Sequence, residues 1–162
     1  MYSGRCKVKG DDASLTAYAS VEDEVHNEMM KTCLNELKKR GFINLKAVFE
    51  NMPQPEQIDD YMPDFTFNKK DKPSIFVIFE VETCSSIMSK DTDKKWKIFY
   101  ERAKASDGEF HLAVPKFCNG DSGRILANQK LQELNIEADL VWAVNGSLRC
   151  KGADVPTHDE GR

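Results

Sequence analysis

Long hydrophobic runs and signal-like segments are missing from this sequence. No stretch of apolar residues is long enough to span a bilayer, and the N-terminal stretch MYSGRCKVKGDDASL lacks the apolar centre of a secretory signal peptide. Positive charge is not in excess either, because the net charge is −4 at pH 7. This balance argues against a protein whose whole surface binds nucleic acid, but it is compatible with a local basic face. We expect a cytoplasmic protein with no membrane partner.

Cysteines are few and show no short paired spacing. There are five of them, an odd number: Cys6, Cys33, Cys84, Cys118 and Cys150. Their scatter indicates neither a disulfide framework nor a zinc site, and it predicts free thiols in a reducing compartment. The three histidines, His26, His111 and His158, are equally scattered and form no metal-ligand pattern. We expect His111 to be a hydrogen-bonded residue of the sheet.

What the sequence does contain is enough for one folded domain. A chain of 162 residues with 40% hydrophobic and 31% charged residues can bury one full core and is too short for two. Residues 1–20 are weakly patterned, and residues 146–162 are polar and contain glycine. We therefore expect a single domain over residues 1–145, followed by a polar C-terminal tail.

Hydrophobic periodicity predicts the order of the elements. Apolar residues four apart between residues 21 and 40 predict an amphipathic helix that ends at Gly41. A strand follows over residues 42–49, then an irregular loop with two prolines. Later segments predict a helix over 91–105, a strand over 109–115, a helix from 121 to 134 and a strand over 138–144. In the first of these helices, Trp96, Phe99 and Tyr100 are spaced as core residues rather than as a surface for stacking bases.

A β-hairpin is predicted between the proline-rich loop and the lysine-bearing helix. Its arms are residues 64–68, in the stretch PDFTFN, and residues 75–83, in the stretch SIFVIFEVET, and the polar turn KKDKP joins them. The order of elements is helix, three strands, helix, strand, helix and strand. It predicts an α/β fold with a central mixed sheet and flanking helices.

Three carboxylates are expected to meet at one end of this hairpin. Alternate residues of a strand point to the same face, so Glu80 and Glu82 lie on one side at the end of the second arm. Asp64 begins the first arm, and antiparallel pairing places it beside them. Carboxylate oxygens suit a hard divalent cation such as Mg²⁺, which can activate water and neutralise charge on a phosphodiester.

This arrangement resembles the PD-(D/E)XK nuclease superfamily, the restriction-endonuclease-like fold that archaeal Holliday-junction resolvases share. The resemblance covers residues 22–144 and the αβββαβ order of the core; Pro63 and Asp64 match the PD, and Glu80 matches the (D/E). It implies a nuclease dependent on Mg²⁺ or Mn²⁺ that hydrolyses phosphodiester bonds, as a DNA endonuclease. In such a protein Asp64, Glu80 and the backbone carbonyl of Val81 would bind the metal.

One position departs from the family pattern. Glu82 stands where the family most often has lysine, and it could act as a general base or as a further metal ligand but cannot supply positive charge. Lys95 or Lys97, on the following helix, is the candidate for a displaced lysine. Lys94, Lys95 and Lys97 would contact phosphate if the acids form an active site, and are otherwise a solvated face.

Resolvase-like members also imply a glutamate from the first helix. Glu28 is the best match by position, with Glu24 as a second choice, and solvated helix surface is the alternative for each.

Two alternatives stay open from the sequence. The chain could be a catalytically inactive DNA-binding or assembly protein on the same fold, which Glu82 and the acidic net charge favour. It could also be an α/β domain of unrelated function, in which the PD and EVE motifs never meet. A nuclease of this kind often works as a homodimer that cuts two strands.

Overall fold

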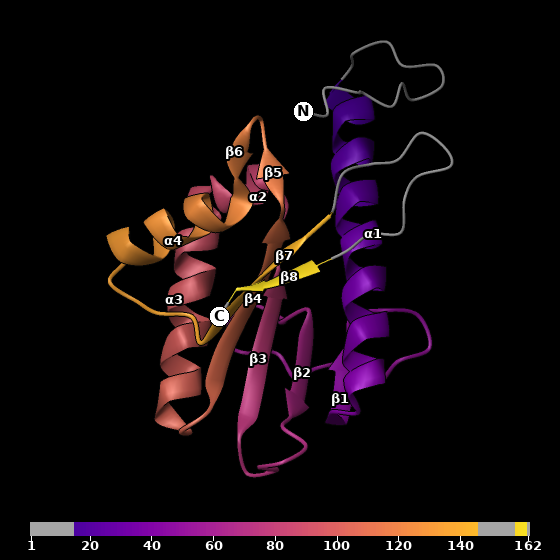
Figure 1. Ribbon diagram of the computed structural model, residues 1–162, viewed down its shortest axis with the longest axis vertical. Helices are drawn as coiled ribbons and strands as arrows, with labels where there is room; N and C mark the ends of the chain where they lie inside the picture. The colour runs from indigo at the N-terminus through magenta and orange to yellow at the C-terminus, as the bar shows by residue number, and fades with distance from the viewer. Residues whose placement is uncertain (1–14, 146–157, 162) are drawn as a thin grey trace.

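The protein folds as a mixed β-sheet between two layers of helices (Figure 1). The structure, a computed structural model, describes residues 15–145 and 158–161, and describes side chains from residue 22 to residue 145. The helices are α1 (Leu15–Arg40), α2 (Cys84–Ile87), α3 (Lys90–Ala105) and α4 (Gly123–Glu133). The strands are β1 (Ile43–Ala47), β2 (Phe65–Asn68), β3 (Phe76–Val81), β4 (Glu109–Pro115), β5 (Phe117–Cys118), β6 (Asp121–Ser122), β7 (Leu140–Val144) and β8 (His158–Gly161). The predicted α/β class, with a mixed sheet flanked by helices, is confirmed.

The main sheet has six strands in the order β1-β2-β3-β4-β7-β8. Strands β1, β2 and β3 form an antiparallel meander, whereas β3, β4 and β7 run parallel to one another. The parallel strands are joined by crossovers that contain α3 and α4, as parallel connections require. Carboxyl ends of β3, β4 and β7 therefore lie at one edge of the sheet, where the predicted acids are found.

Helix α1 covers one face of the sheet. Its buried residues recur at helical spacing, and Met29, Cys33 and Leu37 pack in one cluster with residues of β2 and β3 such as Phe65 and Phe79. The helix ends before Gly41, whose positive φ of 71° is easily adopted only without a side chain. Although α1 is 26 residues long, no helix in the described part of the chain is apolar enough to cross a membrane.

Helices α3 and α4 cover the opposite face (Figure 1). Trp96, Phe99 and Ala103 of α3 are buried against Ile78 and Leu112 of the sheet, which confirms the predicted core role of Trp96 and Phe99; Tyr100 is only partly buried. Because β3 is covered on both faces, its apolar residues need no polar alternation until the strand ends. Glu80 and Glu82 are the point at which this apolar pattern stops.

Several elements differ from the sequence-based expectations. Residues 158–161, expected in the polar tail, form strand β8 and pair antiparallel with β7. Helix α1 begins at Leu15, inside the segment judged weakly patterned, while residues 1–14, 146–157 and 162 lie outside the described residues. The short helix α2 and the β5–β6 hairpin were not predicted, because pieces of two to four residues carry too little periodicity to be recognised.

The prediction of free thiols is wrong for one pair of cysteines. Cys84 and Cys118 form a disulfide with a Cα–Cα distance of 5.5 Å, although they are separated by 34 residues. The pairing was hidden because β5 follows β4, which lies beside β3 only in the folded sheet. Cys33 is a free, buried thiol, and Cys6 and Cys150 lie outside the described residues. A disulfide is at odds with the expected reducing compartment.

Candidate functional site

The β2–β3 hairpin brings Asp64 and Glu80 together. Phe65 pairs with Phe79, so Asp64 lies across from Glu80. The Asp64 N–H donates to Glu80 Oε1 at 2.9 Å, and the Val81 N–H donates to Asp64 Oδ2 at 2.8 Å. The PD and EVE motifs therefore meet, as predicted.

Pro63 explains why the Val81 carbonyl has no ladder partner from β2. The register that pairs Phe65 with Phe79 places Pro63 opposite Val81. Proline has no N–H, so it cannot donate the bond that would continue the antiparallel ladder to the Val81 carbonyl. Asp64 instead takes the Val81 N–H with its side chain. The ladder therefore ends here, with two carboxylates and a backbone carbonyl oxygen side by side.

Lys95 of α3 supplies the positive charge of the site. Its Nζ lies 2.8 Å from Glu80 Oε2 and 3.0 Å from Glu82 Oε2. The N-terminal part of α3 is held by Lys130 of α4, which donates to the Ser89 carbonyl at 2.8 Å and pairs with Asp93. Of the lysines expected near the acids, Lys95 is the one that the structure brings to them.

Lys94 and Lys97 lie elsewhere on α3. Both are exposed, whereas the Lys95 side chain is only 20% exposed. Residues of an α-helix are separated by about 100°, which puts Lys97 on roughly the opposite side of the helix from Lys95. The structure therefore does not bring Lys94 and Lys97 to the carboxylates, and a phosphate held at the acids would meet Lys95 first.

Glu82 is held by groups that the sequence did not reveal. Its Oε1 accepts a hydrogen bond from Ser86 Oγ at 2.6 Å, and its Oε2 accepts one from Trp96 Nε1 at 2.8 Å. The residue is 1% exposed. A free general base or metal ligand needs an oxygen that faces the site, so neither predicted role fits the observed bonding of Glu82.

Helix α1 contributes a histidine rather than a glutamate. His26 Nε2 lies 3.5 Å from Asp64 Oδ2. Glu24 and Glu28 are each two residues from His26, which turns them about 160° away from it, and both are exposed. The structure therefore does not bring Glu28 to the acids. The missed signal was the spacing of His26 with Met30 and Cys33, which continues the buried stripe of α1 toward the end of the sheet.

The electrostatics reflect three carboxylates around one ammonium. Burial and the neighbouring Asp64 raise the pKa of Glu80 well above its usual value, although Lys95 opposes this. Burial alone would lower the pKa of Lys95, but Glu80 and Glu82 outweigh it and raise the pKa, so the ammonium stays protonated. Burial alone would lower the pKa of His26 as well, but the hydrogen bond and the charge of Asp64 outweigh it and raise the pKa. The site is short of positive charge.

The donor atoms are all oxygens, but they do not form a ready metal cage. Within the described residues, no group of three or more His, Cys, Asp or Glu side chains is placed to hold a metal ion. Two carboxylates and a carbonyl are nevertheless the ligands that Mg²⁺ takes when water and substrate complete its shell. The residues present at Asp64, Glu80 and Val81 therefore fit a hard divalent cation, provided that Lys95 gives up its contact with Glu80.

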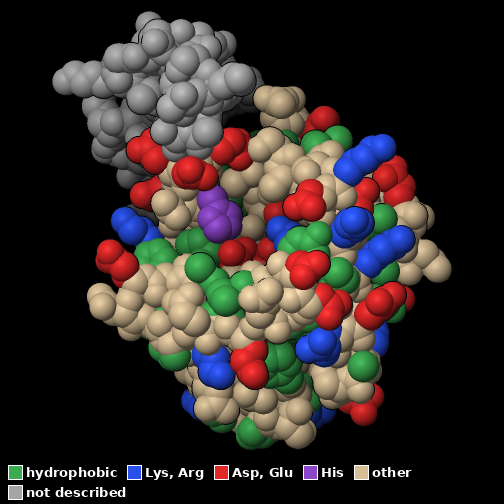
Figure 2. Space-filling view, turned by 180° about the vertical axis from the view of Figure 1, so that it is seen from behind, with side chains coloured by type: hydrophobic (Ala, Val, Ile, Leu, Met, Phe, Trp, Pro, Cys, Tyr) green, Lys and Arg blue, Asp and Glu red, His purple; other side chains and the backbone are tan. Residues whose placement is uncertain are grey.

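The surface around the helices carries both signs of charge. On the face shown in Figure 2, Lys and Arg side chains lie among Asp and Glu side chains and do not form one continuous basic area. This mixture agrees with the net charge of −4. Contacts with a polyanion would therefore be local.

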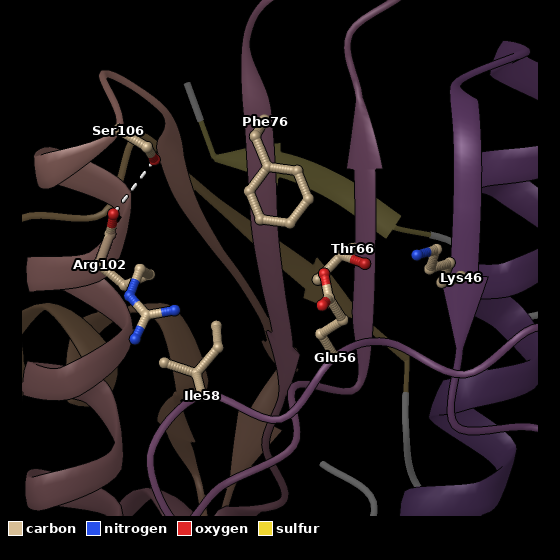
Figure 3. A pocket seen from close by; sticks show the side chains of 7 residues that line it. All are labelled: Lys46, Glu56, Ile58, Thr66, Phe76, Arg102 and Ser106. Carbon is tan, nitrogen blue, oxygen red and sulfur yellow. Dashed lines mark hydrogen bonds between the residues drawn. The ribbon is translucent and has the colours of Figure 1, made fainter.

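A separate hollow of about 210 Å³ lies on the same face of the sheet as α3. Figure 3 shows its lining residues, which come from β1, β2, β3, α3 and its C-cap, and the loop before β2: Lys46, Glu56, Ile58, Thr66, Phe76, Arg102 and Ser106. Phe76 is the first residue of β3, whereas Glu80 is near its end. The hollow is thus distinct from the acids, and none of the residues that carry the acid site lines it.

The fold and the site define an α/β protein with a buried cluster of acids and one lysine at the carboxyl edge of its sheet. Comparisons with protein-family models, with curated proteins and with solved structures returned no match.

Proposed function

We propose that this protein is a divalent-metal-dependent phosphodiester hydrolase that acts as a nuclease on DNA. The observation that carries the proposal is the position of Lys95 Nζ, 2.8 Å from Glu80 and 3.0 Å from Glu82, beside Asp64. An ammonium from the next helix takes the place of the lysine that the motif lacks at position 82. Acids, a carbonyl and an ammonium at one point are what phosphodiester hydrolysis needs.

In this proposal each residue has a defined task. Asp64, Glu80 and the Val81 carbonyl would hold Mg²⁺ or Mn²⁺, which when bound polarises the phosphodiester and helps to activate water. Lys95 would bind the non-bridging oxygens of the phosphate and offset the negative charge that develops on them. His26 would steady Asp64 through Oδ2, which it already meets at 3.5 Å and which also accepts the Val81 N–H.

The partner would be the nucleic acid backbone. Lys94 and Lys97, exposed on α3, could extend the phosphate contact along a longer substrate, with a contribution that falls as salt rises. A homodimer would give two sites for two strands. Light scattering with and without a DNA duplex measures whether such a dimer forms.

Metal-dependent stability and cleavage test the proposal together. Thermal unfolding would be followed with Mn²⁺ or Mg²⁺ for the wild type, for Asp64→Asn and for Glu28→Gln, a matched control that removes an exposed carboxylate. We expect the metal to stabilise the wild type and the control but not Asp64→Asn. Cleavage of labelled plasmid and single-stranded DNA should follow the same order. A wild type that ignores both metals and cuts nothing while folded would refute the proposal.

A second candidate is a catalytically inactive DNA-binding or assembly protein on the same fold. The observation that favours it is that Lys95 already pairs with both glutamates, which are 2% and 1% exposed, so the cluster is closed without any metal. Under this alternative, DNA binding measured by fluorescence anisotropy would be the same in Mn²⁺ and in a chelator. It would also survive Asp64→Asn.

A further inference from the structure

Glu82 has both carboxylate oxygens occupied. Ser86 Oγ donates to Oε1 at 2.6 Å, while Trp96 Nε1 at 2.8 Å and Lys95 Nζ at 3.0 Å both meet Oε2. With 1% of its surface exposed, Glu82 is closed to water. A carboxyl group with three donors around it is fixed in one orientation. It is suited to holding a cation in one place.

Glu80 differs from Glu82 in what surrounds it. It shares Lys95 at 2.8 Å, but its other oxygen accepts the Asp64 N–H, so it belongs to the hairpin end where a divalent cation would bind. A cation at Asp64 and Glu80 would repel the Lys95 ammonium. Without a second anchor, Lys95 would leave the site as the cation enters.

The two groups that hold Glu82 come from different helices. Trp96 follows Lys95 in α3, so one helical turn brings both the ammonium and the indole N–H to Oε2. Ser86 lies in α2, a helix of four residues that is too short to be stable alone. The disulfide between Cys84 of α2 and Cys118 of β5 ties that helix to the β5–β6 hairpin that follows β4. The position of Glu82 is thus determined from two sides.

We propose that Glu82 is the anchor of Lys95 and that Trp96 and Ser86 are positioning residues that hold this anchor. When Glu80 binds a divalent cation, which is part of the proposed function, the anchor keeps the ammonium in the site. Glu82 then takes part neither as a general base nor as a metal ligand.

Acetylation of Lys95 tests the anchor without relying on activity. The folded full chain would be treated briefly with acetic anhydride, with and without Mn²⁺, and modification of Lys95 would be quantified by mass spectrometry against exposed Lys97 in the same sample. In the wild type, Lys95 should stay protected under both conditions. In Glu82→Gln, adding Mn²⁺ should raise its modification about tenfold, the equivalent of one lost charge-assisted hydrogen bond.

Substitutions of the two positioning residues should have the same effect as Glu82→Gln, but a smaller one. Ser86→Ala and Trp96→Phe should each increase Mn²⁺-dependent modification of Lys95 by a few-fold and slow cleavage without moving the Mn²⁺ midpoint of the thermal shift. Trp142→Phe, which removes another buried indole, is the matched control for Trp96→Phe and should leave Lys95 protected. If Lys95 in Glu82→Gln stays as protected as in the wild type, the anchor is overturned. A lost Mn²⁺ response in Glu82→Gln would show that Glu82 is a ligand and would overturn it equally.

A metal-free arm separates this inference from the proposed function. Glu80→Gln weakens the other contact of Lys95, so in a chelator Lys95 should remain protected in this variant and become reactive only in Glu80→Gln/Glu82→Gln. If Mn²⁺ has no effect on the wild type, the proposed function fails, but the metal-free comparison still tests whether Glu82 holds Lys95. Equal modification of the single and double variants would overturn it, with circular dichroism confirming that both are folded.

Discussion

Two clusters of charged residues lie at opposite ends of the same central strands, and they are built in opposite ways. At the start of β4, a single acid, Glu109, has two partners: His111 Nε2 at 2.9 Å and Lys69 Nζ at 3.1 Å. At the end of β3, Glu80 and Glu82 share one ammonium beside Asp64. The expected hydrogen-bonded role of His111 is thereby confirmed.

The pKa values move in opposite directions in these two clusters. The hydrogen bond from His111, aided by Lys69, lowers the pKa of Glu109 to about 2 in spite of partial burial. Burial and Asp64 raise the pKa of Glu80 well above its usual value. An acid surrounded by donors stabilises the fold, whereas buried acids that share too few cations store unfavourable charge. A cluster of the second kind is where function is expected.

The largest effect should follow from removing the only ammonium that meets Glu80 and Glu82 in the described site. Lys95→Met leaves both buried glutamates without a cation, so we expect the free energy of unfolding at pH 7 to fall by about 3–5 kcal/mol. The loss should shrink at lower pH, because protonation of Glu80, whose pKa is already raised, relieves it. Urea denaturation measures this, and the exposed Lys97→Met should stay within about 0.5 kcal/mol of the wild type. A loss from Lys95→Met as small as that of the control would break the comparison.

Removing the disulfide should affect the acid cluster and spare the Glu109 cluster. Cys84→Ser/Cys118→Ser should lower the free energy of unfolding by about 4 kcal/mol, as expected for a loop of this size. Because α2 carries Ser86, hydrogen exchange should speed up more at the Ser86 amide than at the Phe110 amide, next to Glu109, where only the loss of global stability acts. Equal acceleration at both amides would mean that the disulfide stabilises the whole sheet rather than the site.

Removing one carboxylate from each cluster should change the free energy of unfolding in opposite directions. Glu80→Gln should raise the free energy of unfolding by up to about 1 kcal/mol at pH 7 without metal, because the ionised Glu80 is costly in the folded state. Glu109→Gln should lower it by about 1 kcal/mol, since a half-exposed ion pair is lost. Both are measured by urea denaturation in a chelator. The same sign for the two variants would contradict the charge imbalance proposed here.

The smallest effect concerns acid pH. The pKa of Glu109 is lowered to about 2 in the folded state, so its stabilisation is present above the unfolded value near 4.5 and is lost as pH falls from there toward 2. We expect the stability difference between the wild type and Glu109→Gln, about 1 kcal/mol at pH 6, to shrink at pH 3. A difference that is constant with pH would show that Glu109 acts through packing alone.

Local patterns were sufficient for the hairpin and for the acids on it. Asp64, Glu80 and Glu82 were placed correctly because strand alternation and antiparallel register follow from near neighbours in the chain. The role of Glu82 was not predicted correctly, because that role depends on its hydrogen-bond partners, and these come from α2 and α3. Glu28 was misjudged for a related reason. Position along a helix says little about which side chain faces a strand more than thirty residues away until the helix is docked.

By itself the sequence determined the order of the longer helices and strands and the three acids at one end of the β2–β3 hairpin, because these depend on periodicity and on antiparallel register over short distances. Only the tertiary structure decided that Lys95, Trp96 and His26 meet those acids and that Cys84 meets Cys118. These contacts join elements that are brought together by packing of α1 and α3 on opposite faces of one sheet, and no local pattern encodes that packing.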